Sequence, residues 1–209
     1  MRTIGIYLAA GESKRMGKDK RYLQLNEQPL GSIVFKNALL SKIDHLVVVT
    51  RVIDSLDWLP SFAFSGPYSS KWSQIECREA NRGQGHSLKT GLKKAIDIGA
   101  DSVIILLADQ PFVTAEVINT LLSSFQKEPY YFFIAAANDH LPMPPILFTK
   151  ICFPFLLQLN GDQGLRKVIR ENLFNRGKMI SFQDPMLFFD IDTVEDYELL
   201  QNHEHERGE

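Results

Sequence analysis

Small residues followed by clustered cations occupy the segment from Leu8 to Lys20, whose sequence is LAAGESKRMGKDK. The small residues Ala9–Gly11 would let backbone N–H groups approach an anion closely. Arg15 and Lys20 are among the basic residues that follow, and such side chains offset the charge of phosphate oxygens. Because a triphosphate needs both features, the segment indicates a nucleotide-phosphate-binding loop. Composition alone leaves a plain basic surface loop as the alternative.

Carboxylates at two other places are candidates for holding a metal ion beside such a loop. Asp109 follows the buried apolar run 103–107, and a strand there would deliver it to the mouth of a site. Asp190 and Asp192 alternate along a short predicted strand, which would place both on one face. Nucleotidyl transfer needs a metal ion to neutralise phosphate charge and to orient the departing pyrophosphate. The plainer alternative for Asp109 and Asp192 is to cap the helix that follows.

These motifs resemble those of one known family. The first loop is similar to the signature LAAGxSxRMGxxK of the MobA-like nucleotidyltransferases, most of all in their molybdenum cofactor cytidylyltransferase branch. The segments LADQP at 107–111 and DIDTVED at 190–196 resemble the family's metal-binding motifs, with Val194 in place of a proline. The resemblance extends over residues 4 to 197, roughly, with the motifs in the family's order.

The resemblance implies roles for individual residues. Arg15 would hold the β- and γ-phosphates and Lys20 the α-phosphate. Asp109 and Asp192 would bind Mg²⁺, with Asp190 only as a possible support. The catalytic candidates are Arg15, Lys20 and Asp109. The nucleotide-binding candidates are Leu8, Ala9, Ala10, Gly11, Ser13, Arg15, Lys20 and Ser87.

Other segments resemble the family's helix-start and acceptor elements. Ser87 in SLKTGL is expected at a helix start, where it would cap the helix or present its hydroxyl to the nucleotide. Met143 and Pro144 stand where the family usually carries Gly and His, and His86 receives no catalytic role. The acceptor-binding candidates are Gln110, Pro145, Asp162 and Arg166.

Alternating strand and helix patterns must position these residues. Apolar runs predict buried strands at 4–8, 46–50 and 103–107, and further short strands at 74–78, 131–137, 179–182 and 188–191. Helices are predicted to begin near Pro29, Ser87, Thr114, Leu165 and Thr193. The proline-interrupted segment 142–148 predicts an edge strand or an extended loop.

This alternation predicts an α/β three-layer sandwich with a mostly parallel sheet. The resemblance implies a Rossmann-like nucleotide-diphospho-sugar transferase fold. We expect one domain over residues 1–200 and a polar, frayed tail at 201–209.

The overall composition argues against several classes of protein. The 209-residue chain has a formal net charge of -2, so no global field favours nucleic acid or an anionic membrane. No apolar run reaches the length of a membrane span. The 2 cysteines, Cys77 and Cys152, lie far apart, which excludes a disulfide framework. We therefore expect a cytoplasmic protein that binds neither nucleic acid nor membrane.

The leading hypothesis is Mg²⁺-dependent transfer of CMP from CTP to the phosphate of molybdenum-bound molybdopterin. Pyrophosphate would be released, and the dinucleotide cofactor would pass to a client molybdenum hydroxylase of the xanthine dehydrogenase type. The choice of CTP rests on Ala10, because guanylyl-transferring relatives tend to carry LAGG there. The alternatives are a guanylyltransferase of the same family, a non-catalytic molybdenum-cofactor-binding chaperone, and a transferase for a sugar or polyol phosphate.

Overall fold

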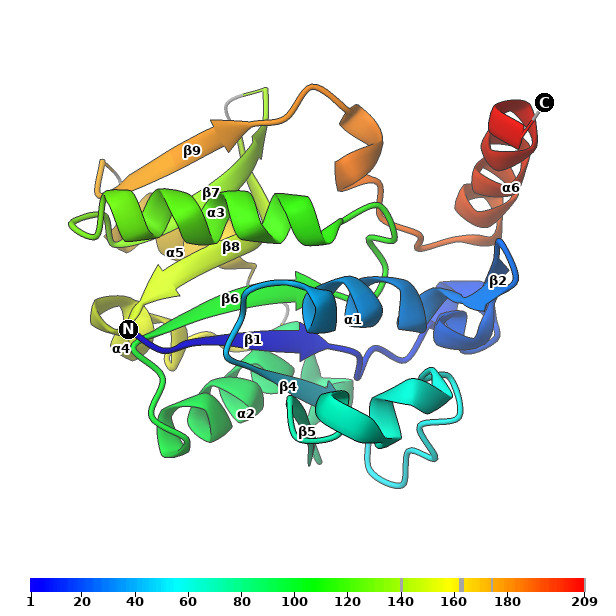
Figure 1. The fold of residues 1–209 in the computed structure, drawn as a ribbon, viewed down its shortest axis with the longest axis horizontal. Helices are drawn as coiled ribbons and strands as arrows, with labels where there is room; N and C mark the ends of the chain where they lie inside the picture. The colour runs from blue at the N-terminus through cyan, green and yellow to red at the C-terminus, as the bar shows by residue number, and fades with distance from the viewer. Residues whose placement is uncertain (140, 162–163, 174, 209) are drawn as a thin grey trace.

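The computed structural model of the chain describes residues 1–139, 141–161, 164–173 and 175–208. A 7-stranded sheet of order β5-β4-β1-β6-β8-β7-β9 forms its centre, with helices on both faces (Figure 1). All neighbouring strands are parallel except where β8 pairs with β6 and β7. The predicted three-layer α/β architecture is confirmed. The strands are β1 (Thr3–Leu8), β4 (His45–Thr50), β5 (Trp72–Glu76), β6 (Ser102–Leu107), β7 (Phe133–Asn138), β8 (Leu141–Thr149) and β9 (Gly177–Ser181).

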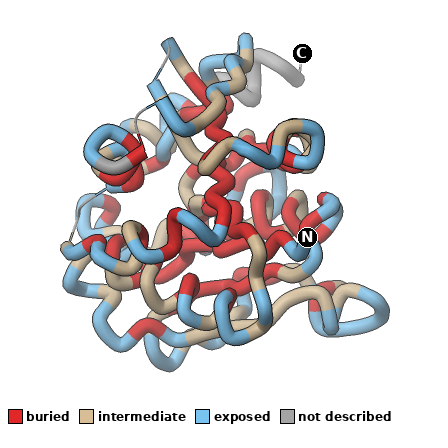
Figure 2. The backbone as a smooth tube through the Cα atoms, turned by 90° about the vertical axis from the view of Figure 1, so that its left-hand side faces the viewer, coloured by how far each residue is buried: buried red, intermediate tan, exposed pale blue. Residues whose placement is uncertain are grey.

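Two apolar cores enclose the sheet. Side chains of β1 alternate between them, so that Tyr7 packs into one core and Ile6 into the other, both fully buried. Helices α1 (Leu30–Leu40) and α3 (Ala115–Lys127) cover the first face. The second face is covered by α2 (Gln84–Asp97), α4 (Phe153–Leu156) and α5 (Leu165–Asn172). Buried residues accordingly concentrate in the middle of the molecule, along the sheet (Figure 2). Among the described residues, no helix has the length and apolar character needed to cross a bilayer.

The strand β8 corrects the expectation of an edge strand or loop at 142–148. It lies inside the sheet, antiparallel to both β6 and β7. Its prolines are tolerated there because pairing with β6 begins only at Ile146, beyond the last of them. The register with β7 also shifts between Ala135 and Ala136, opposite the proline-rich part.

The C-terminal part also differs from expectation. Residues 188–191 do not form a strand, because a short 3-10 helix, η7 (Pro185–Phe188), precedes an irregular connection. That connection crosses the end of β6, where Ile191 N–H donates to the Asp109 carbonyl at 3.0 Å. Helix α6 (Val194–Gly208) continues through the stretch that was expected to fray. The helix begins near Thr193 as predicted, with a capping box in which the Thr193 and Asp196 side chains accept each other's N–H groups at 3.2 and 2.8 Å.

A third, smaller core joins the two ends of the chain. The short hairpin of β2 (Gln24–Leu25) and β3 (Gln28–Pro29) contributes Leu25. The same cluster contains Met16 from the first loop, Ile191 from the connection before α6, and Leu200 from α6. The Tyr197 hydroxyl also donates to the Gln24 carbonyl at 2.6 Å. The first loop and the last segment are thereby held against each other, far apart as they are in sequence.

Candidate active site

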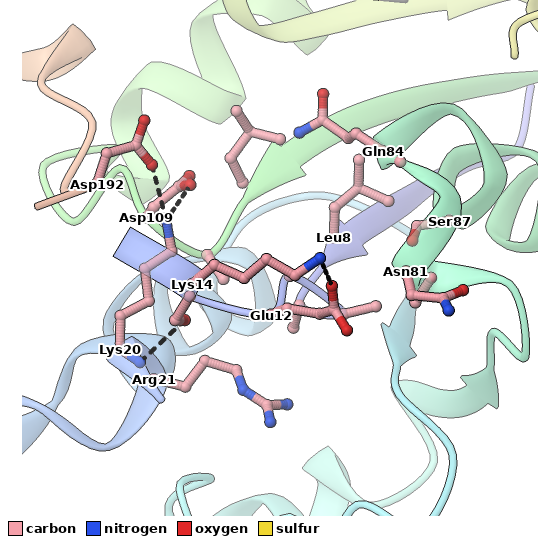
Figure 3. A pocket seen from close by; sticks show the side chains of 18 of the residues that line it. Leu8, Glu12, Lys14, Lys20, Arg21, Asn81, Gln84, Ser87, Asp109 and Asp192 are labelled. Carbon is pink, nitrogen blue, oxygen red and sulfur yellow. Dashed lines mark hydrogen bonds and ion pairs between the residues drawn. The ribbon is translucent and has the colours of Figure 1, made fainter. Parts of the chain in front are cut away.

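A cavity of about 370 Å³ opens beyond the carboxyl ends of β1 and β6. This is where open α/β sheets bind ligands, because the loops after neighbouring strands converge there. All eight residues predicted to bind nucleotide line it, as do Asp109 and Asp192. In Figure 3, Lys20, Asp109 and Asp192 group on one side of the cavity, and Asn81, Gln84 and Ser87 lie on the opposite side. Leu8 lies between the two groups.

The first loop leaves β1 and turns back around the cavity. Ala9 N–H still donates to the Val49 carbonyl at 2.9 Å, so the loop starts in register with the sheet. A Cβ added at Gly11 would meet no atom within 4 Å, which leaves the backbone open to a ligand. Ser13 adopts a left-handed conformation with φ 51°, and its hydroxyl accepts the Lys20 N–H at 3.1 Å. The loop therefore ends by positioning Lys20.

Lys20 lies between the two carboxylates that were predicted to bind metal. Its Nζ is 2.7 Å from Asp109 Oδ2, 3.1 Å from Asp192 Oδ1 and 2.9 Å from the Ile191 carbonyl oxygen. Burial alone would lower the pKa of the ammonium, but the two carboxylates outweigh it and raise the pKa above its usual value. Arg15 reaches Asp192 Oδ2 at 2.8 Å from the exposed side.

The donor set at this end of the cavity fits a hard divalent cation. Asp109 Oδ1 is buried and has no hydrogen-bond partner in the described part of the chain, so one oxygen is available for coordination. The described residues contain no group of three or more His, Cys, Asp or Glu arranged to hold a metal. Mg²⁺ needs only one or two carboxylates when phosphate oxygens and water complete its shell. Asp109 and Asp192 are such a pair.

Asp190 and Gln110 lie next to this pair. Desolvation of the Asp190 carboxyl, together with the negative charge of Asp109, raises its pKa to about 6. Gln110 is 1% exposed and does not line the cavity, so an acceptor would not meet its side chain on the surface. Its carboxamide forms no hydrogen bond of standard geometry among the described residues, but it lies close enough to Asp190 to oppose the rise in the pKa of that carboxyl.

The other acceptor candidates lie outside the cavity lining. Arg166, from α5, donates through Nε to the Pro142 carbonyl at 3.2 Å and contacts the Met143 sulfur. Pro145 is buried in β8. The structure thus brings Arg166 to the start of β8, and Asp162 falls outside the described residues.

The helix that carries Ser87 begins earlier than predicted. Helix α2 starts at Gln84, with Gly83 before it at φ 114°, so Ser87 lies inside the helix and is not its cap. Ser87 is 5% exposed but still borders the cavity. Sequence reasoning missed Asn81 and Gln84 beside it. Gly83 was the available signal, because a glycine commonly stands where a chain turns into a helix.

A second ion network, also missed from sequence, lies next to the first. The Arg21 guanidinium donates to Asp19 Oδ1 at 2.9 Å and to Asp19 Oδ2 at 2.6 Å, and it pairs with Asp54 on its other side. Its Cζ lies 5.2 Å from the centroid of the Trp58 ring. Trp58 in turn donates from Nε1 to Asp54 at 3.0 Å. We call this the closed network, because Arg21, Asp19, Asp54 and Trp58 bind one another. Arg51 adds a further contact to Asp19.

Comparison with known proteins identifies the family. Residues 5–177 match the MobA-like NTP transferase domain, and the chain belongs to this family of nucleotidyltransferases. It is 37% identical over 199 residues to the purine catabolism protein PucB of Bacillus subtilis, an alignment that covers 95% of each chain. It is 24% identical over 202 residues to a probable molybdenum cofactor guanylyltransferase of Natranaerobius thermophilus, covering 92% of each.

Solved structures share the same fold. A nucleotidyl transferase from Methanothermobacter thermautotroptrophicus superposes with a TM-score of 0.77 at 19% identity, covering 99% of both chains. A manganese complex of Rv0371C from Mycobacterium tuberculosis superposes with a TM-score of 0.71 at 20% identity, covering 97% of this chain and 99% of that one. At such identities the similarity establishes the fold alone.

Proposed function

We propose that this protein transfers CMP from CTP to the terminal phosphate of molybdenum-bound molybdopterin, with release of pyrophosphate. The observation that carries the proposal is the position of Lys20 between Asp109 and Asp192, at one end of a cavity bordered by the first loop. The purine catabolism and molybdenum cofactor relatives support the acceptor. The product would serve a client hydroxylase of the xanthine dehydrogenase type.

The loop would hold the triphosphate through its backbone and its cations. The space beside Gly11 is open, so a phosphate could approach the backbone there, and Arg15 is exposed enough to swing from Asp192 to the β- and γ-phosphates. Lys20 would meet the α-phosphate, where negative charge builds up on the oxygens during transfer. Asp109 and Asp192 would hold Mg²⁺, which neutralises triphosphate charge when bound. The manganese complex of the solved relative makes a divalent ion reasonable here.

The reaction needs no nucleophile from the protein. An oxygen of the acceptor phosphate attacks the α-phosphorus of CTP, and the bond to the bridging oxygen of pyrophosphate breaks. The protein's contribution is to align the two phosphates and to stabilise the charge that builds up. Lys20 meets this need because its ammonium is held within 3.1 Å of both carboxylates before any substrate arrives.

The preference for CTP rests on Ala10 in the first loop. Ala10 lines the cavity but is 2% exposed, so most of its methyl group packs into the core and only its edge faces a base. Its effect on the base would therefore be exerted largely through the position of the loop. Ala10→Gly is the direct probe, and it should increase the use of GTP relative to CTP.

The decisive experiment incubates the protein with Mg²⁺, molybdenum-loaded molybdopterin and each α-labelled triphosphate in turn. We expect the cytosine dinucleotide and pyrophosphate, with a small but measurable residual yield of labelled product from Lys20→Ala. Equal or better use of GTP would replace CTP in the proposal by the guanylyltransferase alternative. Absence of pyrophosphate with every triphosphate, together with tight molybdopterin binding, would favour the non-catalytic chaperone.

A further inference from the structure

Asp19 precedes Lys20 in the chain but does not line the cavity. We propose that Asp19 is a positioning residue, whose carboxylate fixes the turn that carries Lys20 and so directs the ammonium toward Asp109 and Asp192. The catalytic meaning of this inference rests on the proposed function, whereas the positioning itself rests on contacts within the chain.

The contacts of Asp19 hold the backbone immediately after Lys20. Asp19 caps the short 3-10 helix η2 (Lys20–Tyr22), because its Oδ1 accepts the Arg21 backbone N–H at 3.1 Å. The same oxygen accepts from Arg21 Nε at 2.9 Å. On the other side, the Lys20 N–H is held by the Ser13 hydroxyl at 3.1 Å. Both peptide groups that flank the Lys20 Cα are therefore tied down, one by Ser13 and one by Asp19.

The frame behind Asp19 is rigid because Arg21 has almost no room to move. Arg21 is 4% exposed, and it contacts the Trp58 ring on one side. A Cβ added at Gly31 of α1 would lie 2.9 Å from the Arg21 Cβ, so the helix backbone packs directly against this side chain. Asp54, whose side chain is 2% exposed, fixes the far end of the guanidinium. Asp19 thereby connects the Lys20 turn to the buried interior rather than to a mobile surface group.

The charge state of Asp19 is consistent with this role. Burial of the carboxyl would raise its pKa, but the hydrogen bonds and charge of Arg21, with a smaller effect of Arg51, lower it below the usual value. The ionised carboxylate accepts hydrogen bonds more strongly than a neutral group would. An alanine at this position would lose both the cap and the ion pair.

Amine acylation followed by mass spectrometry tests the positioning without any substrate. In the unmodified protein Lys20, with 12% of its side chain exposed, should react far more slowly than Lys14, with 75% exposed. Asp19→Ala should raise the Lys20 rate, relative to Lys14, by about fivefold or more, as expected for loss of a cap. Asp19→Asn keeps an oxygen for the Arg21 N–H and should give an intermediate rate.

Thr114→Ala is the matched control. It also removes a side-chain cap, the acceptor of the Val117 N–H at 3.3 Å, but at the start of α3 and outside the cavity lining. It should leave Lys20 acylation unchanged. The proposal is overturned if Asp19→Ala leaves Lys20 as slow as before, or if Thr114→Ala accelerates it equally.

Turnover separates positioning from catalysis. Asp19→Ala should lower kcat with little change in the KM for CTP, and it should cause no further loss in a Lys20→Ala background, because it acts through Lys20. An additive loss in that background would contradict the inference. If the unmodified protein transfers no nucleotide at all, the proposed function fails, while the acylation result still decides the positioning.

Discussion

Lys20 and Arg21 are neighbours in sequence, and each places one cation between two carboxylates. Lys20 bridges Asp109 and Asp192, whose side chains are 22% and 37% exposed. Asp109 Oδ1 remains without a partner in the described part of the chain. This network therefore leaves one carboxylate oxygen available for the metal ion proposed above.

The Arg21 network has the opposite character. The guanidinium is 5% exposed and its fork is matched by Asp19 on one side and Asp54 on the other. Trp58 donates a further hydrogen bond to Asp54. The planar guanidinium of Arg21 packs against Trp58 and the backbone of α1 and makes a fixed support. The ammonium of Lys20 instead contacts Asp109, whose Oδ1 has no partner in the described part of the chain. The comparison teaches that similar ion networks serve different ends according to which oxygens are left unsatisfied.

The largest expected effect is on the activity of the open network, which is the contact of Lys20 with Asp109 and Asp192. Asp109→Asn removes the charge that would hold a metal, and it should lower kcat by about a thousandfold or more. Stability should change little, because the amide keeps the shape and remains partly hydrated. Pyrophosphate release and urea unfolding measure the two quantities. Near-normal transfer by this variant would remove Asp109 from the site.

The matching change in the closed network should act on stability. Arg21→Met leaves the buried carboxylate of Asp54 without its cation and removes one of the two cations at Asp19. It should lower the free energy of unfolding by about 3–5 kcal/mol. Urea unfolding at neutral pH measures it. A loss as small as that of an exposed ion pair would mean that the closed network is not a structural support.

Exchanging the cation type at the open site sharpens the contrast. Lys20→Arg keeps the charge but replaces the compact ammonium by a wider fork, and it should lower kcat by about a hundredfold. The folded state should be retained, as judged by circular dichroism. Full activity would show that charge alone is required there, and that the geometry of the ammonium is not.

The smallest expected effect is a pH dependence of the closed network. Because the pKa of Asp19 is lowered in the folded state, its stabilisation is present above the unfolded pKa and is lost as pH falls through the folded value. Asp19→Asn cannot titrate, so the stability difference from the unmodified protein should shrink on acidification from neutral pH. Urea unfolding at stepwise lower pH measures this difference. A constant difference would contradict the assignment.

The sequence predicted where the first loop and Asp109 lie because both follow strands that local patterns reveal. The loop follows β1 directly, and Asp109 follows β6. It did not predict the interior position of β8, because proline content argues for an edge unless the pairing partners are known. The network around Arg21 was equally hidden, since Asp54 lies in an irregular segment and only the fold brings it close. Ser87 was misplaced because helix starts are the least certain part of a periodic pattern.

Because the first loop packs against the C-terminal segment, the candidate site depends on residues that are synthesised at different times. The first loop and Asp109 are synthesised before Asp192 and the α6 anchor at Leu200. A nascent chain that ends before this point has the sheet strands β1, β4 and β6 but not the second carboxylate. The two carboxylates can therefore come together only after these strands have been synthesised.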